Sequence, residues 1–168
     1  QFPLRKHFEN LTDDYENIDQ VRKYWILAQD KLNIDNKIKF LKTHHINCKI
    51  GNFSFTNKSN TAATIYIVRD PRNVVTSLSN HFSLKINEAK DFIFSPRVIG
   101  ISKQKEEKQN KLATIIGTWQ DHFISWTAKN DNLLLIKYED LLENTEKEIK
   151  KIINFTKIFI KFTFSEEK

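Results

Sequence analysis

Two short polar clusters contain side chains that could bind an anion and transfer a charged group. In the first, Lys42 and His44 follow a short apolar run, Ile38-Lys39-Phe40-Leu41, that predicts a strand. Side chains two residues apart in extended chain point to the same side, so the ammonium and the imidazole converge. An imidazole accepts a proton near neutral pH, and an ammonium neutralises charge that develops on a transferred group. On the residues alone, a Lys-Thr-His without function stays an open alternative.

The second cluster lies where a buried strand is followed by a helix. Residues 63–68 (Ala-Thr-Ile-Tyr-Ile-Val) predict a strand that is covered on both faces. Asp70 and Pro71 predict the start of a helix, with the acid as N-cap and proline in the first turn. Arg69 and Ser77 would then offer a guanidinium and a hydroxyl near a helix N-terminus, which suits a phosphate monoester. The alternative is an Arg69 paired with a carboxylate such as Asp70, and a Ser77 that only faces solvent.

The elements that must position these clusters alternate along the chain. Short connections between alternating strands and helices predict an α/β three-layer sandwich with a mostly parallel sheet, as one domain over residues 1–168. In such sheets, ligands bind beyond the carboxyl ends of the strands, where both clusters lie. Apolar spacing predicts helices over 21–32, 71–82, 115–126 and 141–153, a buried strand over 132–136, a long loop over 47–62 and a surface excursion over 91–111.

Composition excludes several classes of protein. The chain of 168 residues is 39% hydrophobic, which excludes a disordered protein, and no apolar run reaches the roughly 20 residues that cross a bilayer. The net charge of +6 favours anionic partners, but acids interleave with the lysines, so a nucleic-acid-binding module is the weaker alternative. Cys48 is the single cysteine, which fits the cytoplasm. His7, His81 and His122 lack partners at metal-ligand spacing, so no metal site is predicted.

Four segments, taken in order, resemble the soluble sulfotransferases, which use 3′-phosphoadenosine 5′-phosphosulfate (PAPS). They are Lys-Thr-His at 42–44, Arg-Asp-Pro-Arg-Asn-Val-Val-Thr-Ser at 69–77, Gly-Thr-Trp-Gln-Asp-His-Phe-Ile-Ser-Trp at 117–126 and Leu-Leu-Leu-Ile-Lys-Tyr-Glu-Asp-Leu at 133–141. The resemblance covers residues 40–155, and the stretch 68–82 is more similar to the bacterial branch than to the animal one. It implies an incomplete α/β fold like that of the P-loop NTPases, and sulfuryl transfer without a metal to a hydroxyl or amine of a small-molecule or glycan acceptor.

The resemblance also implies a role for each residue of the two clusters. Arg69 and Ser77 match the pair that grips the 3′-phosphate of the nucleotide. His44 matches the base that deprotonates the acceptor, and Lys42 matches the lysine that lines the acceptor and sulfuryl site. Ile116 stands where the family often has a tyrosine that contacts adenine, so this contact is not expected here.

Two segments that the resemblance leads us to expect are not in the sequence. One is the phosphosulfate-binding loop with its Pro-Lys-Ser-Gly-Thr-Thr-like sequence, and the other is an Arg-Lys-Gly loop. The chain has three widely separated glycines and no methionine, so we expect a piece of a longer sulfotransferase that is inactive by itself. A kinase-like nucleotide-binding domain, which would need acids that bind Mg²⁺, and a degenerate fragment stay as alternatives. The sequence predicts neither the acceptor's identity nor the oligomeric state.

Overall fold

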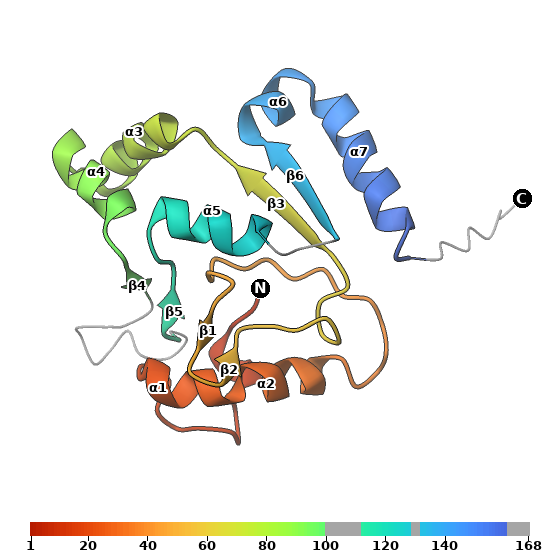
Figure 1. Ribbon diagram of the computed structural model, residues 1–168. Helices are drawn as coiled ribbons and strands as arrows, with labels where there is room; N and C mark the ends of the chain where they lie inside the picture. The colour runs from red at the N-terminus through yellow and green to blue at the C-terminus, as the bar shows by residue number, and fades with distance from the viewer. Residues whose placement is uncertain (100–111, 129–131, 161–168) are drawn as a thin grey trace, which may run out of the picture.

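A pair of parallel strands carries the ends from which the second polar cluster extends. The computed structural model describes residues 1–99, 112–128 and 132–160. In it, β3 (Thr64–Val68) pairs with β6 (Leu133–Lys137), with Thr64 opposite Leu133 and Val68 opposite Lys137 (Figure 1). The strands predicted at 63–68 and 132–136 are therefore confirmed, and so is an α/β fold with parallel strands. Their faces are less covered than predicted, because Ile67 and Leu135 are about half exposed.

Helices follow each of the two strands. α3 (Pro71–Phe82) begins after β3 with Asp70 as N-cap, as predicted, and packs against α4 (Ile86–Phe94). β6 is followed directly by α6 (Tyr138–Glu143) and then by α7 (Thr145–Lys157), which lies beside β6. Figure 1 shows α5 (Trp119–Thr127) on the other side of the strand pair from α7. Among the described residues, no helix has the length and apolar character that crossing a bilayer requires.

The N-terminal part packs around an aromatic core. It contains η1 (Arg5–His7), α1 (Ile18–Val21), η2 (Arg22–Tyr24) and α2 (Trp25–Leu32), so the helix predicted over 21–32 is confirmed in three pieces. Its buried side chains form one cluster with residues from α5 and from the segment before it: Phe2, Phe8, Val21, Trp25, Ala28, Phe55, Leu112 and Trp126. This cluster supports the chain that precedes β3 and thus the first polar cluster.

The strand predicted at Ile38–Leu41 is wrong. These residues have no regular secondary structure, and Ile38, Phe40 and Leu41 are 52%, 70% and 43% exposed. A strand needs a neighbour that takes up its backbone hydrogen bonds, and none of the described strands pairs with this segment. Apolar, β-compatible residues alone do not provide that partner.

Three other predicted elements differ from the structure. The stretch 47–62 contains a small antiparallel hairpin of β1 (Lys49–Ile50) and β2 (Phe53–Ser54) rather than only a loop. Ahead of α5, β5 (Thr114–Ile115) pairs with β4 (Val98–Ile99), so the helix begins at Trp119 and not at 115. A helix, α4, extends into the predicted excursion at 91–111, whose part from 100 to 111 lies outside the described residues.

His45 is a fully buried histidine in the aromatic core. Its ring stacks on Phe55 at 4.1 Å between centroids and meets the edge of Trp25 at 4.7 Å. Nδ1 donates to the Ile46 carbonyl at 2.6 Å, while Nε2 has no hydrogen-bond partner in the described chain. Burial therefore lowers the pKa of His45 to about 4, because a proton on Nε2 would be an unpaired buried charge.

The free energy of unfolding should fall as the pH drops from 7 to 5, in part because of His45. Its ordinary pKa of 6.5 applies in the unfolded chain, which therefore binds the proton first and gains stability below pH 6.5. We expect wild type to lose about 2 kcal/mol more than His45→Leu between pH 7 and pH 5. Urea denaturation at both pH values measures this difference, and equal losses in the two proteins would contradict it.

Two glycines with positive φ provide a matched test of backbone and packing effects. Gly117 (φ +69°) lies between β5 and α5, and a Cβ there would stand 2.9 Å from Cδ1 of the buried Ile46. Gly51 (φ +60°) lies in the β1–β2 turn with nothing within 4 Å. Gly117→Ala should lower the free energy of unfolding by about 1–2 kcal/mol, and Gly51→Ala by less, since only the first adds a contact to the conformational strain. Equal losses in urea denaturation would show that Ile46 yields freely.

Candidate active site

Arg69 and Ser77 line one cavity of about 480 Å³ at the end of β3. The other lining residues all lie on α3, each three or four positions from Ser77 or from another of them, so they share one side of the helix: Asn73, Thr76, Asn80 and His81. Amides, hydroxyls, an imidazole and a guanidinium line this cavity, and no carboxylate does. The lining therefore suits an anion, and the structure brings this predicted pair together.

The guanidinium of Arg69 contacts an aromatic ring rather than a carboxylate of the described chain. Its Nε is buried and has no hydrogen-bond partner there. Its Cζ lies 4.8 Å from the centroid of the Tyr138 ring, at the end of the neighbouring strand. A cation over an aromatic face is stabilised while its N–H groups stay available at the edge. Tyr138 is a residue whose role the sequence analysis missed, because only the strand pairing brings it to Arg69.

Asp70 is occupied by Arg72. The Asp70 carboxylate accepts from the Arg72 guanidinium at 2.6 Å and from the Arg72 backbone N–H at 2.8 Å. These hydrogen bonds lower the pKa of Asp70 to about 2. The alternative in which Asp70 neutralises Arg69 is thus not what the structure shows.

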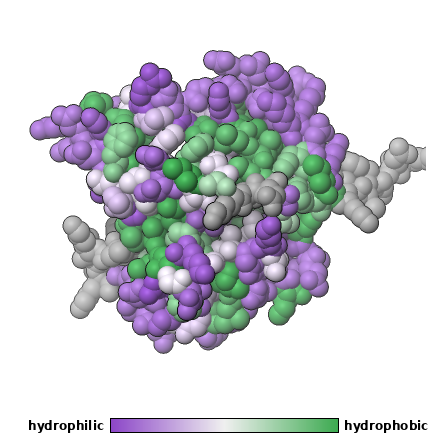
Figure 2. Space-filling model, viewed as in Figure 1, coloured by the Kyte–Doolittle hydropathy of each residue, from purple (hydrophilic) through white to green (hydrophobic). Residues whose placement is uncertain are grey.

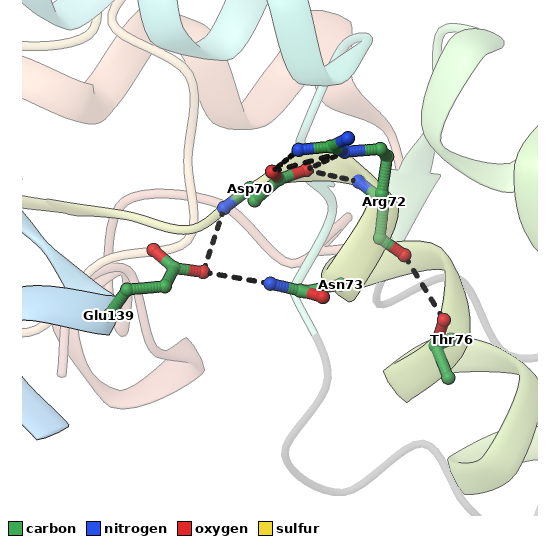
Figure 3. A network of polar contacts seen from close by, with 5 residues as sticks. All are labelled: Asp70, Arg72, Asn73, Thr76 and Glu139. Carbon is green, nitrogen blue, oxygen red and sulfur yellow. Dashed lines mark hydrogen bonds and ion pairs between the residues drawn. The ribbon is translucent and has the colours of Figure 1, made fainter.

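Glu139 ties the start of α3 to the end of β6. Its Oε1 accepts from the Asp70 backbone N–H at 3.2 Å and from the Asn73 side-chain amide at 3.1 Å, as Figure 3 shows. The hydrogen bond from Asn73 is the main cause of the lowered pKa of Glu139. Because Asn73 also lines the Arg69 cavity, this carboxylate fixes one wall of it.

Lys42 and His44 line a second, larger cavity of about 990 Å³. Thr43 between them lines it too, and the segment is not a strand, so the alternation that their spacing predicts is not what brings them together. Partial burial, followed by the nearby Lys42 charge, lowers the pKa of His44 below its ordinary value of 6.5. The imidazole is therefore neutral at pH 7 and able to accept a proton.

The wall of this second cavity is largely apolar. It includes exposed side chains of the 38–41 segment and of β3, such as Phe40 and Ile67, together with Phe155 of α7. Figure 2 shows apolar surface on the viewed face between more hydrophilic regions. The two cavities have no lining residue in common, so the four predicted residues form two pairs.

The backbone around His44 is held from α5. The Trp126 indole N–H donates to the His45 carbonyl at 3.0 Å, and His122 Nε2 lies 3.3 Å from the His44 carbonyl oxygen. Trp126 is buried and also packs in the aromatic core. Among the described residues, no group of three or more His, Cys, Asp or Glu side chains is placed to bind a metal.

These features define an α/β domain with a cavity at the end of a parallel strand whose polar and cationic lining suits an anion. The pattern that defines the sulfotransferase domain family matches residues 5–167. Sulfotransferase 2A1 of Rattus norvegicus is 34% identical over 139 residues, which cover 80% of this chain and 45% of the relative. The chain belongs to the sulfotransferase domain family.

Other relatives have similar names and extents. The 3-beta-hydroxysteroid sulfotransferase of Cavia porcellus is 28% identical over 144 residues, covering 80% of this chain and 45% of the relative. Sulfotransferase 1E1 of Rattus norvegicus is 30% identical over 119 residues, covering 70% and 37%. The chain thus spans less than half the length of these curated relatives. All three are mammalian proteins, and the similarity of 68–82 to the bacterial branch stays a prediction.

Replacing Arg72 should raise the pKa of Asp70. In Arg72→Ala the side-chain hydrogen bonds are lost but the backbone N–H remains, so the pKa should move from about 2 part of the way to the ordinary value of 3.8. A titration of the side-chain carboxyl carbon by NMR measures this. A pKa that stays at about 2 would show that another cation, with Arg69 the nearest in sequence, holds the carboxylate.

Proposed function

We propose that the chain is part of a sulfotransferase that transfers a sulfuryl group from PAPS to a hydroxyl, and that it holds the 3′-phosphate of that nucleotide. The observation that carries the proposal is that Arg69 and Ser77 line one cavity, which no carboxylate lines. A guanidinium and a hydroxyl without a competing carboxylate suit a phosphate. Family membership supports PAPS as the source of the anion.

In the proposed site, Arg69 and Ser77 bind the phosphate oxygens. A guanidinium offers a planar fork of donors to a phosphate, and the Ser77 hydroxyl adds a third donor from α3. Ser77 is exposed at the cavity wall, six residues after the first residue of α3. The stacking on Tyr138 fixes the guanidinium plane before the anion arrives, which reduces the entropy lost on binding.

His44 is the proposed base and Lys42 the proposed charge-stabilising group. PAPS supplies the activated sulfuryl group when bound. The neutral His44 imidazole takes the proton of the acceptor hydroxyl, and the Lys42 ammonium offsets negative charge on the transferred group. Partial burial and then the Lys42 charge disfavour the charged form of His44, which keeps the proposed base neutral.

The acceptor that we propose is a small hydroxylated molecule. The name of the Cavia porcellus relative specifies a hydroxysteroid, and the largely apolar wall beside His44 is compatible with an apolar body next to the reacting hydroxyl. A glycan hydroxyl is the alternative. The single Cys48 fits a reducing compartment, and we propose the cytoplasm.

Binding of adenosine 3′,5′-bisphosphate tests the nucleotide site. Arg69→Ala should weaken binding by about 10- to 100-fold and Ser77→Ala by about 10-fold, because each removes hydrogen bonds to a charged group. Isothermal titration calorimetry with this nucleotide and with adenosine 5′-monophosphate gives both affinities. The losses should appear only for the ligand that carries a 3′-phosphate.

Arg72→Lys is the matched control, because this arginine is 89% exposed at its side chain and lines neither cavity, and the lysine keeps a cation beside Asp70. It should bind both nucleotides as wild type does. Equal losses in the Arg69 and Arg72 variants, or no binding by wild type, would overturn the proposed site. Loss of binding in chelator would favour the kinase-like alternative, and binding of duplex DNA that falls steeply with salt would favour the nucleic-acid module.

A further inference from the structure

Three side chains on one face of α5 contact backbone atoms of residues 44, 45 and 47. His122 Nε2 lies 3.3 Å from the His44 carbonyl oxygen, and Trp126 Nε1 donates to the His45 carbonyl at 3.0 Å. The Ser125 hydroxyl oxygen accepts from the Asn47 N–H at 3.1 Å. Ser125 and Trp126 are three and four residues after His122, so all three side chains lie on one side of the helix.

The second ring nitrogen of His122 contacts the strand that leads to Arg69. His122 Nδ1 lies 2.9 Å from the hydroxyl of Tyr66, which is in β3 three residues before Arg69. The ring is thus the polar bridge between the strand of the anion cavity and the segment of the proposed base.

The hydrogen bonds determine where the protons are. A carbonyl oxygen only accepts, so Nε2 of His122 carries the proton and donates to His44. Nδ1 of the neutral ring is then an acceptor, and the Tyr66 hydroxyl donates to it. Burial lowers the pKa of His122 and raises the pKa of Tyr66 to about 12, so both groups are neutral at pH 7. One proton of the bridge is therefore on His122 Nε2 and the other on the Tyr66 hydroxyl.

We infer that His122 is a positioning residue for His44: it holds the main chain of the proposed base in place and links it to the strand that ends at Arg69. The inference rests on the proposed function for the meaning of His44 as a base. The contact itself involves only groups of this chain. The titratable groups around the bridge are His44, Lys42, His45 and Tyr66, from the 42–45 segment and β3.

The pKa of His44 in the 168-residue chain reports its placement. It is lowered by partial burial and by Lys42, so a His44 that moves into solvent should titrate closer to 6.5. We expect this rise in His122→Phe, which keeps the ring but loses both hydrogen bonds. His122→Gln should keep the lowered pKa, because its amide nitrogen can take the place of Nε2. NMR titration of the imidazole Cε1–H, assigned with His44→Asn, measures the pKa.

Amide hydrogen exchange provides a second readout. The backbone N–H groups of residues 44–46 should exchange about fivefold faster in His122→Phe, as for the loss of one hydrogen bond, and at the wild-type rate in His122→Gln. Ser125→Ala is the matched control on the same helix face. It removes the acceptor for Asn47 and should leave the pKa of His44 unchanged.

The outcomes separate the two proposals. Neither measurement uses a nucleotide. A chain that fails to bind adenosine 3′,5′-bisphosphate therefore refutes the proposed function, while the pKa of His44 and the amide exchange rates still test the role of His122. A folded His122→Phe with wild-type pKa of His44 and wild-type exchange would overturn the inference. Should His122→Phe not fold, His122→Asn, whose amide is too short to reach the His44 carbonyl, replaces it. Equal pKa values of His44 in His122→Asn and His122→Gln would then overturn it.

Discussion

The position of Arg69 at its cavity depends on the parallel pairing of β3 with β6. Because parallel strands end at the same edge, the register that sets Val68 opposite Lys137 also places the residues after them side by side. The Tyr138 ring therefore lies under the Arg69 guanidinium, and Glu139 reaches the first turn of α3. A shift in this register would separate the guanidinium from the ring and α3 from its carboxylate anchor at once. The placement of Arg69 at the cavity therefore depends on strand pairing and not on α3 alone.

Charge around Arg69 is divided among neighbouring groups so that one cation stays available. Asp70 binds Arg72, and Glu139 accepts from a backbone N–H and an amide, so neither of these nearby acids is directed at Arg69. The aromatic ring stabilises the guanidinium without consuming its donors. Around His44, partial burial and the nearby Lys42 ammonium keep the imidazole neutral. In both places, neighbouring groups set the charge state or the orientation of a side chain for which we propose a function.

The sequence predicts elements whose signal is local and misses those that need a distant partner. Residues 63–68 and 132–136 are apolar and β-branched or leucine-rich, and Asp70-Pro71 is a local helix start, so these predictions are confirmed. The run at 38–41 has the same composition but no described partner strand, and composition cannot reveal that. The pairing of Arg69 with Ser77 in one cavity follows from helix spacing, whereas the contacts of Tyr138 and His122 join residues 69 and 78 positions apart. Those contacts exist only once the strands pair and α5 packs on the core.

The contacts from α5 to residues 44–47 go to main-chain atoms, and this has a consequence for how such a site changes over evolution. Peptide carbonyls and N–H groups are present whatever the side chains are, so the location of positions 44 and 45 is specified independently of what occupies them. A substitution of His44 would therefore change the side chain at this position and leave these backbone hydrogen bonds in place. Backbone contacts from α5 thus fix the location of position 44, while its side chain can change without disturbing them.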